Sequence, residues 1–433
     1  MRVPVLALPA VVAAALALGA CSAPDGVTLA SADETRRIEV MYSFGGDQAA
    51  GFQEAVGRWA RAHGAAVTYT QSDDLAGDIA ARERSGRLPD VLLLPQPGLL
   101  HQLREHGTID AVDDVVPVNR VATRLVPGLV EPLRSGGRTY GVPVAMSVKS
   151  LLWYDRHALH ALELDPPQTL PELVATTRAL RAAGRTPWCL GLAEGAGSGW
   201  PGTDWVEQLV LSQAGVQAYD GWVRGDVTFS DPRIQVAFRT YAEEVAGGSE
   251  GGGAAAATRD VRHAADGLFG DPQRCSLLKQ GSQATQSGFL PDRVRRNLDR
   301  TASVVPFPVG TDGALQVGAD SAALTRGHSM AAEELVRHMV TDVRFAVDWA
   351  GSEDRGFISP RTDFDLARYA STTTRKIAAA AYEAPVVRYD ASDRMPPALG
   401  SGAFWRTMVD LTAGRVTVPQ AVARLDAARA RRG

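Results

Sequence analysis

The spacing of apolar residues changes between strand-like and helix-like several times in the first part of the chain. Residues 37–42 alternate apolar with polar side chains, which is typical of a strand with one buried face. Residues 91–94 are wholly apolar, as in a parallel strand that is covered on both faces. The predicted order is strand 37–42, turn 43–46, helix 47–63, strand 65–70, helix 75–85, strand 90–94 and helix 98–106. This alternation predicts an α/β, doubly wound unit.

The segment from Tyr140 to Tyr154 is rich in β-branched and aromatic residues and predicts an extended strand. Ser147, Lys149 and Ser150 interrupt its apolar run. One interpretation is a core strand with a polar face. The other is a strand that crosses between two lobes and presents these residues to a cleft. The second is favoured because only three of the 45 basic residues are lysine, and a compact ammonium suits hydroxyl or carbonyl acceptors.

Helices dominate after this strand, and extended segments return twice. The predicted elements are a helix over 169–183 with a capping box at Thr169 and Glu172, a strand at 188–192, helices at 204–214 and 230–244, an exposed Gly/Ala-rich loop at 247–257, an extended piece at 304–308, helices at 330–340 and 342–350, and an extended crossing at 356–361. Three crossings predict two lobes, each built from discontinuous segments: lobe 1 from 37–145 and 303–351, and the helix-rich lobe 2 from 146–302 and 352–433.

Composition supports a packed globular protein, with 45% hydrophobic and 22% charged residues. A chain of 433 residues is long for one core and fits two lobes. The net charge of −4 gives no electrostatic basis for binding nucleic acid. After the N-terminal segment, no apolar run approaches the length of a membrane span, so a polytopic membrane protein is excluded.

The first 21 residues match a bacterial lipoprotein signal peptide. Met1 and Arg2 give a short basic start, residues 3–17 are almost wholly apolar, and small residues precede Cys21. We expect residues 1–20 to be removed, Cys21 to receive the lipid, and residues 21–36 to form a flexible tether. The expected location is the outer face of the cytoplasmic membrane. The alternative is a simple membrane anchor, because the apolar run is of marginal length.

Two cysteines remain once Cys21 is assigned to the lipid. In an oxidising compartment, Cys189 and Cys275 are expected to form a disulfide. Two separate buried thiols are the alternative.

Polar residues follow three successive predicted strands, at the places where ligands bind in doubly wound sheets. They are Gly45, Gly46 and Asp47, then Ser72 and Asp73, then Pro95, Gln96 and Pro97. Ordinary turn chemistry explains each of them equally well.

Further along, Trp200 and Trp205 flank Asp204 in a Gly-rich context. A pyranose ring stacks on an aromatic face while its hydroxyls bind carboxylate, amide and ammonium groups, so Trp200 is interpreted as a ligand platform and Trp205 as core.

Catalytic patterns are weak. Residues 247–251 fit G-x-S-x-G but lie outside the strand–turn–helix context that a nucleophile elbow needs. The eight histidines show no metal-binding spacing, and the Asp pairs lie in predicted turns. The sequence therefore predicts neither an enzyme nor a bound metal or cofactor.

Several motifs resemble the extracellular solute-binding proteins of ABC importers, in the sugar-binding family that includes maltose-binding proteins. They lie at 94–99, 148–154, 187–189, 198–205, 317–320 and 357–360, and they are most similar to the α-glucoside-binding branch, which also has a cysteine pair of this kind. Residues 275–283 and the loop before them depart from that branch. The resemblance implies a periplasmic-binding-protein-like (type II) fold with a three-segment hinge and a central ligand cleft. Carried over by position, it implies ligand contacts at Gly46, Asp47, Asp73, Gln96, Lys149, Trp200, Asp204, Gln283, Asp320 and Arg361.

The resemblance implies a protein that binds a ligand without catalysing a reaction. Two lobes would close on an α-glucoside or related oligosaccharide, and the closed monomer would deliver it to the transmembrane permease subunits of an ABC importer. The alternatives are a sugar-sensing or adhesion lipoprotein of the same fold and, as a different class, a secreted glycosidase.

Overall fold

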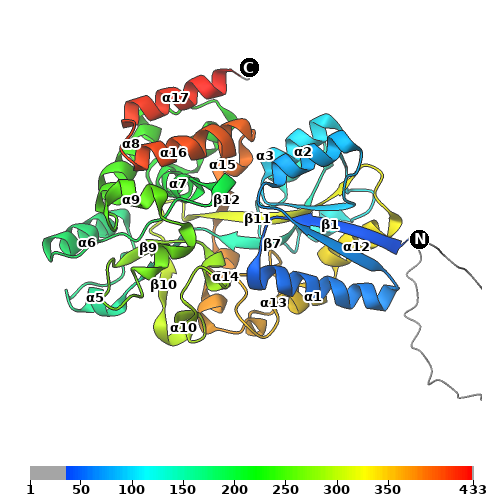
Figure 1. Ribbon diagram of the computed structural model, residues 1–433, viewed down its shortest axis with the longest axis horizontal. Helices are drawn as coiled ribbons and strands as arrows, with labels where there is room; N and C mark the ends of the chain where they lie inside the picture. The colour runs from blue at the N-terminus through cyan, green and yellow to red at the C-terminus, as the bar shows by residue number, and fades with distance from the viewer. Residues whose placement is uncertain (1–35, 432–433) are drawn as a thin grey trace, which may run out of the picture.

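The computed structural model describes residues 36–431, which form two lobes joined by long strands (Figure 1). The predicted α/β class and two-lobed architecture are confirmed. The predicted signal peptide and the lipidation site Cys21 lie outside the described residues. Within residues 36–431, no helix has the length and apolar character needed to cross a membrane.

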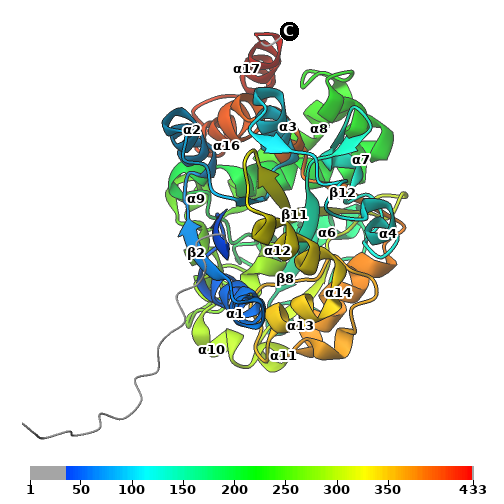
Figure 2. The ribbon, with the colours of Figure 1, turned by 90° about the vertical axis from the view of Figure 1, so that its right-hand side faces the viewer.

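The first lobe has the strand–helix alternation that the sequence predicts. Strands β1 and β2 pair in parallel, and β1 also pairs in parallel with β3. Its elements are β1 (Arg37–Tyr42), α1 (Gly46–His63), β2 (Ala66–Gln71), α2 (Leu75–Ser85), β3 (Val91–Leu94), α3 (Pro97–His106), β4 (Ile109–Asp110), α4 (Val118–Ala122), β5 (Arg134–Ser135), β6 (Arg138–Thr139), α12 (Met330–Thr341) and α13 (Val343–Ala350). Figure 2 shows α2 and α3 on one side of this sheet and α1 and α13 on the other.

Burial follows the pleat of these strands. Val91 and Leu93 pack in the cluster that includes α1, α12 and α13, whereas Leu92 and Leu94 pack under α2 and α3. All four side chains are buried, as the continuous apolar pattern predicts for a sheet covered on both faces.

Strand β11 (Ala314–Thr325) runs through both lobes. Along one edge, residues 314–317 pair in parallel with β12 (Val386–Tyr389) and residues 321–324 pair antiparallel with β3. The strands β12 and β3 therefore run toward each other, and their carboxyl ends face across Gly318–Asp320, which neither strand covers. The other edge pairs with β7 (Val142–Val148) and β4, with a bulge between Asp320 and Ser321.

The crossing segment at 140–154 is two strands and not the single strand predicted. It breaks at Lys149 and Ser150, so that β7 lies in the large sheet and β8 (Leu151–Tyr154) lies in a second sheet. In this second sheet β8 pairs antiparallel with β9 (Leu277–Lys279) and with β10 (Ser303–Pro306). Lys149 therefore stands at the junction of the two sheets.

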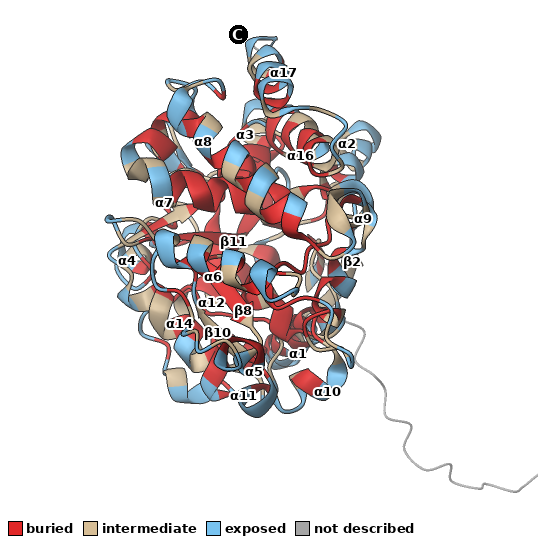
Figure 3. Cartoon of the chain, turned by 90° about the vertical axis from the view of Figure 1, so that its left-hand side faces the viewer, coloured by how far each residue is buried: buried red, intermediate tan, exposed pale blue. Residues whose placement is uncertain are grey.

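The second lobe is rich in helices and has its own core. Trp222, Phe229, Phe238 and Phe404 pack edge to face or stacked within it. Its helices are α5 (Arg156–His160), α6 (Leu170–Ala182), α7 (Trp200–Arg224), α8 (Pro232–Thr240), α9 (Gly252–Thr258), α10 (Asp292–Arg295), α11 (Leu298–Thr301), α14 (Thr372–Glu383), α15 (Ala391–Arg394), α16 (Trp405–Thr412) and α17 (Val418–Ala430). Figure 3 shows buried residues along their inward faces and exposed residues outside.

Three local predictions for this lobe are wrong. The segment 188–192 is not a strand, and in it only Trp188 forms isolated bridges, with Ser249 and Leu277. Helix α7 begins at Trp200 and not at Asp204, with Pro201 in its first turn. The Gly/Ala-rich segment is helical, and Ala256 and Ala257 are buried. Gly253 packs against the carbonyl of Thr412, where a side chain would clash with α16. The capping box of α6 is confirmed: Thr169 and Glu172 exchange hydrogen bonds.

A disulfide joins Cys189 and Cys275, as the cysteine count predicts. Both residues are buried and lie 86 positions apart in the sequence. The bond ties the segment before α7 to the start of β9.

The double variant Cys189→Ala/Cys275→Ala should lose about 4 kcal/mol of unfolding free energy, because the bond closes a long loop in the unfolded chain. Urea unfolding of the two proteins measures the difference. Equal midpoints and slopes would show that the bond adds no stability.

Candidate functional site

The candidate site lies where β3 and β12 end opposite each other on β11. The segment after β3 carries Gln96, and the segment after β12 carries Asp390 and Asp393. Between them, Gly318 and Asp320 are the uncovered part of β11. Because both strands point their carboxyl ends at this gap, both following segments converge above it.

Lys149 lies at the centre of this convergence. Its stem passes Gly318, where a Cβ would come within 3.3 Å of the lysine Cε. Its ammonium contacts Asp390 and lies 2.9 Å from Asp204 Oδ1 and 3.8 Å from Asp393 Oδ2. Only 12% of the side chain is exposed, so the ammonium depends on these carboxylates to compensate for lost solvation. One lysine thus joins β7, α7 and α15.

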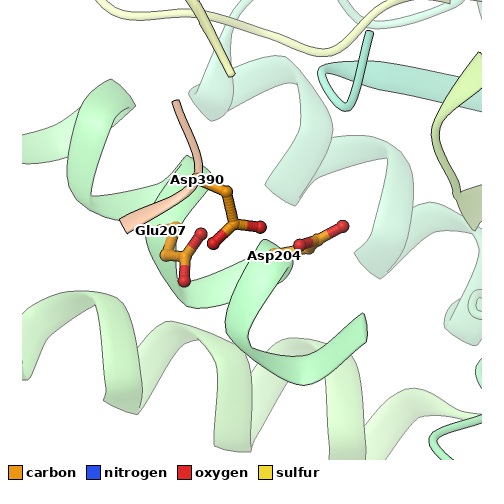
Figure 4. A group of neighbouring side chains, drawn as sticks. All are labelled: Asp204, Glu207 and Asp390. Carbon is orange, nitrogen blue, oxygen red and sulfur yellow. The ribbon is translucent and has the colours of Figure 1, made fainter. Parts of the chain in front are cut away.

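Asp204, Glu207 and Asp390 point their carboxyl groups toward one another, the first two from one turn of α7 and the third from the end of β12 (Figure 4). Glu207 Oε2 accepts hydrogen bonds from Gln316 Nε2 at 2.7 Å and from the amide of Ala391 at 3.1 Å, and Oε1 accepts one from the amide of Ser392 at 3.0 Å. The cluster fixes α7, β11 and α15 to one another.

Burial divides these acids into two groups. It raises the pKa of Asp204 to about 7 and that of Asp393 to about 8, and it raises the pKa of Glu207 well above its usual value. Burial acts on Asp390 too, but Lys149 and hydrogen bonds from Asp204 and Glu207 hold the pKa of Asp390 below its usual range. The carboxylates raise the pKa of Lys149 well above normal in spite of its burial. Lys149 and Asp390 are therefore the charged pair, and burial favours the neutral form of the neighbouring acids.

The carboxyl oxygens of Asp204, Glu207 and Asp390 lie within 4.8 Å of one another, which is a spacing that a cation could occupy. Here the Lys149 ammonium supplies the positive charge. Lys279 adds a second ammonium nearby: burial lowers its pKa to about 8, and its Nζ lies 5.9 Å from the ring centre of Trp205. Trp205 is buried in the core, as predicted.

Trp200 is the first residue of α7 and is half-buried. Its indole Nε1 donates a hydrogen bond to Glu194, and its ring centre lies 5.7 Å from the Lys149 ammonium. The predicted loop position was wrong, but the ring does lie beside Lys149, which in turn contacts Asp204. Helix α7 therefore brings three of the predicted site residues together.

Asp320 differs from the other acids because no compensating group lies beside it. It is half-buried on β11 next to the bulge, and burial alone raises its pKa to about 7. Within residues 36–431, its carboxyl group makes no ion pair or side-chain hydrogen bond with another residue. It is free to accept hydrogen bonds from a ligand.

The predicted residues of the first lobe have different surroundings. Asp47 Oδ2 accepts a hydrogen bond from the amide of Ser287 at 3.1 Å and lies 3.0 Å from Arg295 Nη1. Gly46 has a φ of +55°, and a Cβ there would lie 2.9 Å from Ser287 Oγ. Both residues therefore contact the second lobe. Asp73 is exposed, between β2 and α2.

Two further predicted residues hold the crossing segments. Gln283 Oε1 accepts a hydrogen bond from Ser147 Oγ at 2.6 Å, which places Gln283 against β7. Arg361 is buried, and its guanidinium donates to both carboxylate oxygens of Asp363 at 2.8 Å and to the Val340 carbonyl at 2.8 Å. None of these contacts links Arg361 to another predicted site residue.

Sequence reasoning missed Glu207, Gln316, Asp390 and Asp393. Asp390 accepts a hydrogen bond from the amide of Asp393 and so caps the short helix α15, and this is the only signal that its sequence context carries. Glu207 follows Asp204 by three positions, which puts both on one face of a helix. That spacing could have indicated a pair.

Comparison with known proteins gives a consistent result. The sequence model of the family described as bacterial extracellular solute-binding protein matches residues 45–270. The osmoprotective compounds-binding protein GgtB of Synechocystis sp. is 31% identical over 405 residues, covering 92% of this chain and 93% of the relative. The alpha-glucosides-binding periplasmic protein AglE of Rhizobium meliloti is 29% identical over 381 residues, covering 86% and 82%.

Solved structures agree on the fold. A chitin oligosaccharide binding protein superimposes with a TM-score of 0.76 at 16% identity, covering 91% of this chain and 98% of that one. The fold is the mixed α/β fold of periplasmic binding proteins, like that of the maltose-binding proteins.

Asp320 should make the stability of the protein fall as pH rises. Its folded pKa of about 7 lies above the unfolded value near 4, so its contribution is fully present below about pH 4 and is lost by about pH 7. Asp320→Asn removes this loss. The melting temperature of the variant should therefore rise relative to that of the wild type as pH increases from 4 to 8. The control Asp165→Asn changes an exposed carboxylate and should give a constant difference. A constant difference for Asp320→Asn as well would contradict the assignment.

Proposed function

Because the chain belongs to the family of bacterial extracellular solute-binding proteins, we propose that this substrate-binding protein of an ABC importer captures an α-glucoside or a related oligosaccharide. The family is non-enzymatic, and its members are extracytoplasmic. The ligand would be held between the lobes and released unchanged to the permease subunits.

The observation that carries the proposal is the group of Trp200, Lys149 and Asp320 around the gap in β11. The indole gives an apolar face, the ammonium gives hydrogen-bond donors, and the uncompensated carboxyl group accepts hydrogen bonds. A pyranose presents the complementary set, with C–H faces for the ring and hydroxyls for the two charged groups. AglE, whose name states α-glucoside binding, supports this ligand class, and GgtB widens it to osmoprotective compounds.

Ligand binding would be coupled to closure. A ligand that touches both lobes stabilises the closed arrangement by its differential affinity for the two arrangements. A micromolar ligand supplies about 8 kcal/mol for its contacts and for closure together. No catalytic group is required, because the ligand is released unmodified.

The lipid anchor at Cys21 is part of the proposal. Its support is the sequence before Cys21, in which small residues follow an apolar run. An acylated Cys21 with a tether over 21–36 would keep the domain near a membrane permease.

A thermal-shift panel tests the ligand class. Trehalose, maltose, sucrose, isomaltose, larger α-glucans and glucosylglycerol are compared with glycine betaine, a charged osmoprotectant without a pyranose. At a hundred times its Kd, a ligand adds about 2.7 kcal/mol to stability, so at least one α-glucoside should raise the melting temperature by a few degrees. A shift with glycine betaine and with none of the glucosides would contradict the proposal.

Trp200→Ala should lower the affinity for that glucoside about tenfold or more, because the stacking surface is lost. The ligand-induced change in tryptophan fluorescence should disappear, while the melting temperature changes little, because the side chain is only half-buried. The control Trp200→Phe keeps an aromatic face but loses the bond to Glu194, and it should retain part of the affinity. Unchanged affinity in Trp200→Ala would remove this residue from the site.

A further inference from the structure

Gln96 connects the two lobes. It precedes α3 in the first lobe, at the position where side chains commonly cap a helix, yet its side chain makes no capping bond. Instead, Nε2 donates a hydrogen bond to Asp393 Oδ1 in the second lobe, at 3.1 Å. Asp393 is buried in α15 and Gln96 is half-buried, so this polar contact is partly removed from water.

Gly98 allows α3 to come close enough for this bond. A Cβ at position 98 would overlap the carbonyl oxygen of Met395 and lie 3.1 Å from that of Asp393. Both obstacles are backbone atoms of the second lobe and cannot rotate away as a side chain would. The first turn of α3 therefore rests directly on the backbone of the other lobe.

These contacts lie over the segment of β11 between the ends of β3 and β12. Gly318–Asp320 lack a partner strand on this edge, and a bulge follows Asp320 on the other edge. Opening the lobes about this segment would part Gln96 from Asp393 and lift Gly98 off Met395. Because Asp393 Oδ2 lies 3.8 Å from the Lys149 ammonium, the contact also adjoins the candidate site.

We infer that Gln96, Gly98 and Asp393 form a latch that holds the two lobes closed and thereby sets ligand affinity. Gln96 is then a positioning residue that acts through Asp393, and the ligand contact predicted for it is not needed. The effect on affinity rests on the proposed function. The latch itself is a property of the ligand-free chain.

The test measures the distance between the lobes without ligand. Spin labels at Arg84→Cys on α2 and Arg406→Cys on α16, both exposed positions, report a distance distribution by pulsed electron paramagnetic resonance. With the native latch, the distribution should contain a short, closed distance. Gln96→Ala should lower the ratio of closed to open molecules about fivefold, as expected for one lost hydrogen bond. Gly98→Ala should lower it about tenfold or more, since the closed contact has no room for a methyl group.

Two matched variants separate the latch from general damage. Asp393→Asn keeps an acceptor for Gln96 and should preserve the closed distance. Gln102→Ala changes the same residue type six positions further on, inside α3. Within residues 36–431 the Gln102 side chain makes no hydrogen bond to the second lobe, so the distribution should not change.

The latch is overturned if the distance distribution of the protein with native Gln96 and Gly98 lacks the short distance. It is overturned as well if Gln96→Ala and Gly98→Ala give the same distribution as that protein. It is also overturned if Gln102→Ala shifts the distribution as much as Gln96→Ala. Failure of every sugar in the thermal-shift panel would remove the proposed function and leave these distances unaffected.

Discussion

Strands β3 and β12 pair with the same edge of β11 and run toward each other, so that their carboxyl ends face across Gly318–Asp320. Each ladder fixes the register of its strand, and four steps along β11 separate the last paired residues, about 13 Å. The segments that leave the two strands have to meet over this gap. Gln96, Asp390, Asp393 and Asp320 are brought together by that constraint, although they come from three distant parts of the chain.

The charged side chains in this gap differ in whether an opposite charge lies beside them. Lys149 and Asp390 compensate each other at the centre, and the oxygens of Glu207 accept hydrogen bonds from Gln316 and from the amides of Ala391 and Ser392. Such a cluster organises the second lobe at the cost of desolvating its members. Among residues 36–431 Asp320 has no such partner, and it lies on the strand that both lobes share. Its carboxyl group therefore has the most to gain from a ligand that donates hydrogen bonds.

Local patterns in the sequence predicted the elements whose own residues determine them. The alternating strands of the first lobe, the capping box of α6, the buried Trp205 and the disulfide could all be deduced from residue type and spacing. Strand β11 could not, because Ala, Gly, Ser and Asp have low strand propensity, and its conformation is imposed by neighbours on both edges. The same holds for α9, in which Gly253 packs against the Thr412 carbonyl of α16.

The site was predictable in part for the same reason. Lys149 was identifiable from the rarity of lysine in an arginine-rich chain, and Trp200 and Asp204 from an aromatic–acid motif. Their acidic partners Asp390 and Asp393 look like an ordinary helix cap in the sequence. Only the tertiary structure shows that they lie beside the Lys149 ammonium. The hydrogen bonds of Asp47 and Gln96 to the second lobe depend on how the lobes meet, which a local sequence pattern does not show.

Of the three lysines in the chain, Lys149 and Lys279 have little exposed surface, and Lys376 is exposed on α14. Amine-directed reagents, such as dyes or activated sensor surfaces, therefore find one accessible lysine side chain on the folded protein. Coupling through it would attach every molecule in the same orientation, a useful property for building a biosensor from this scaffold.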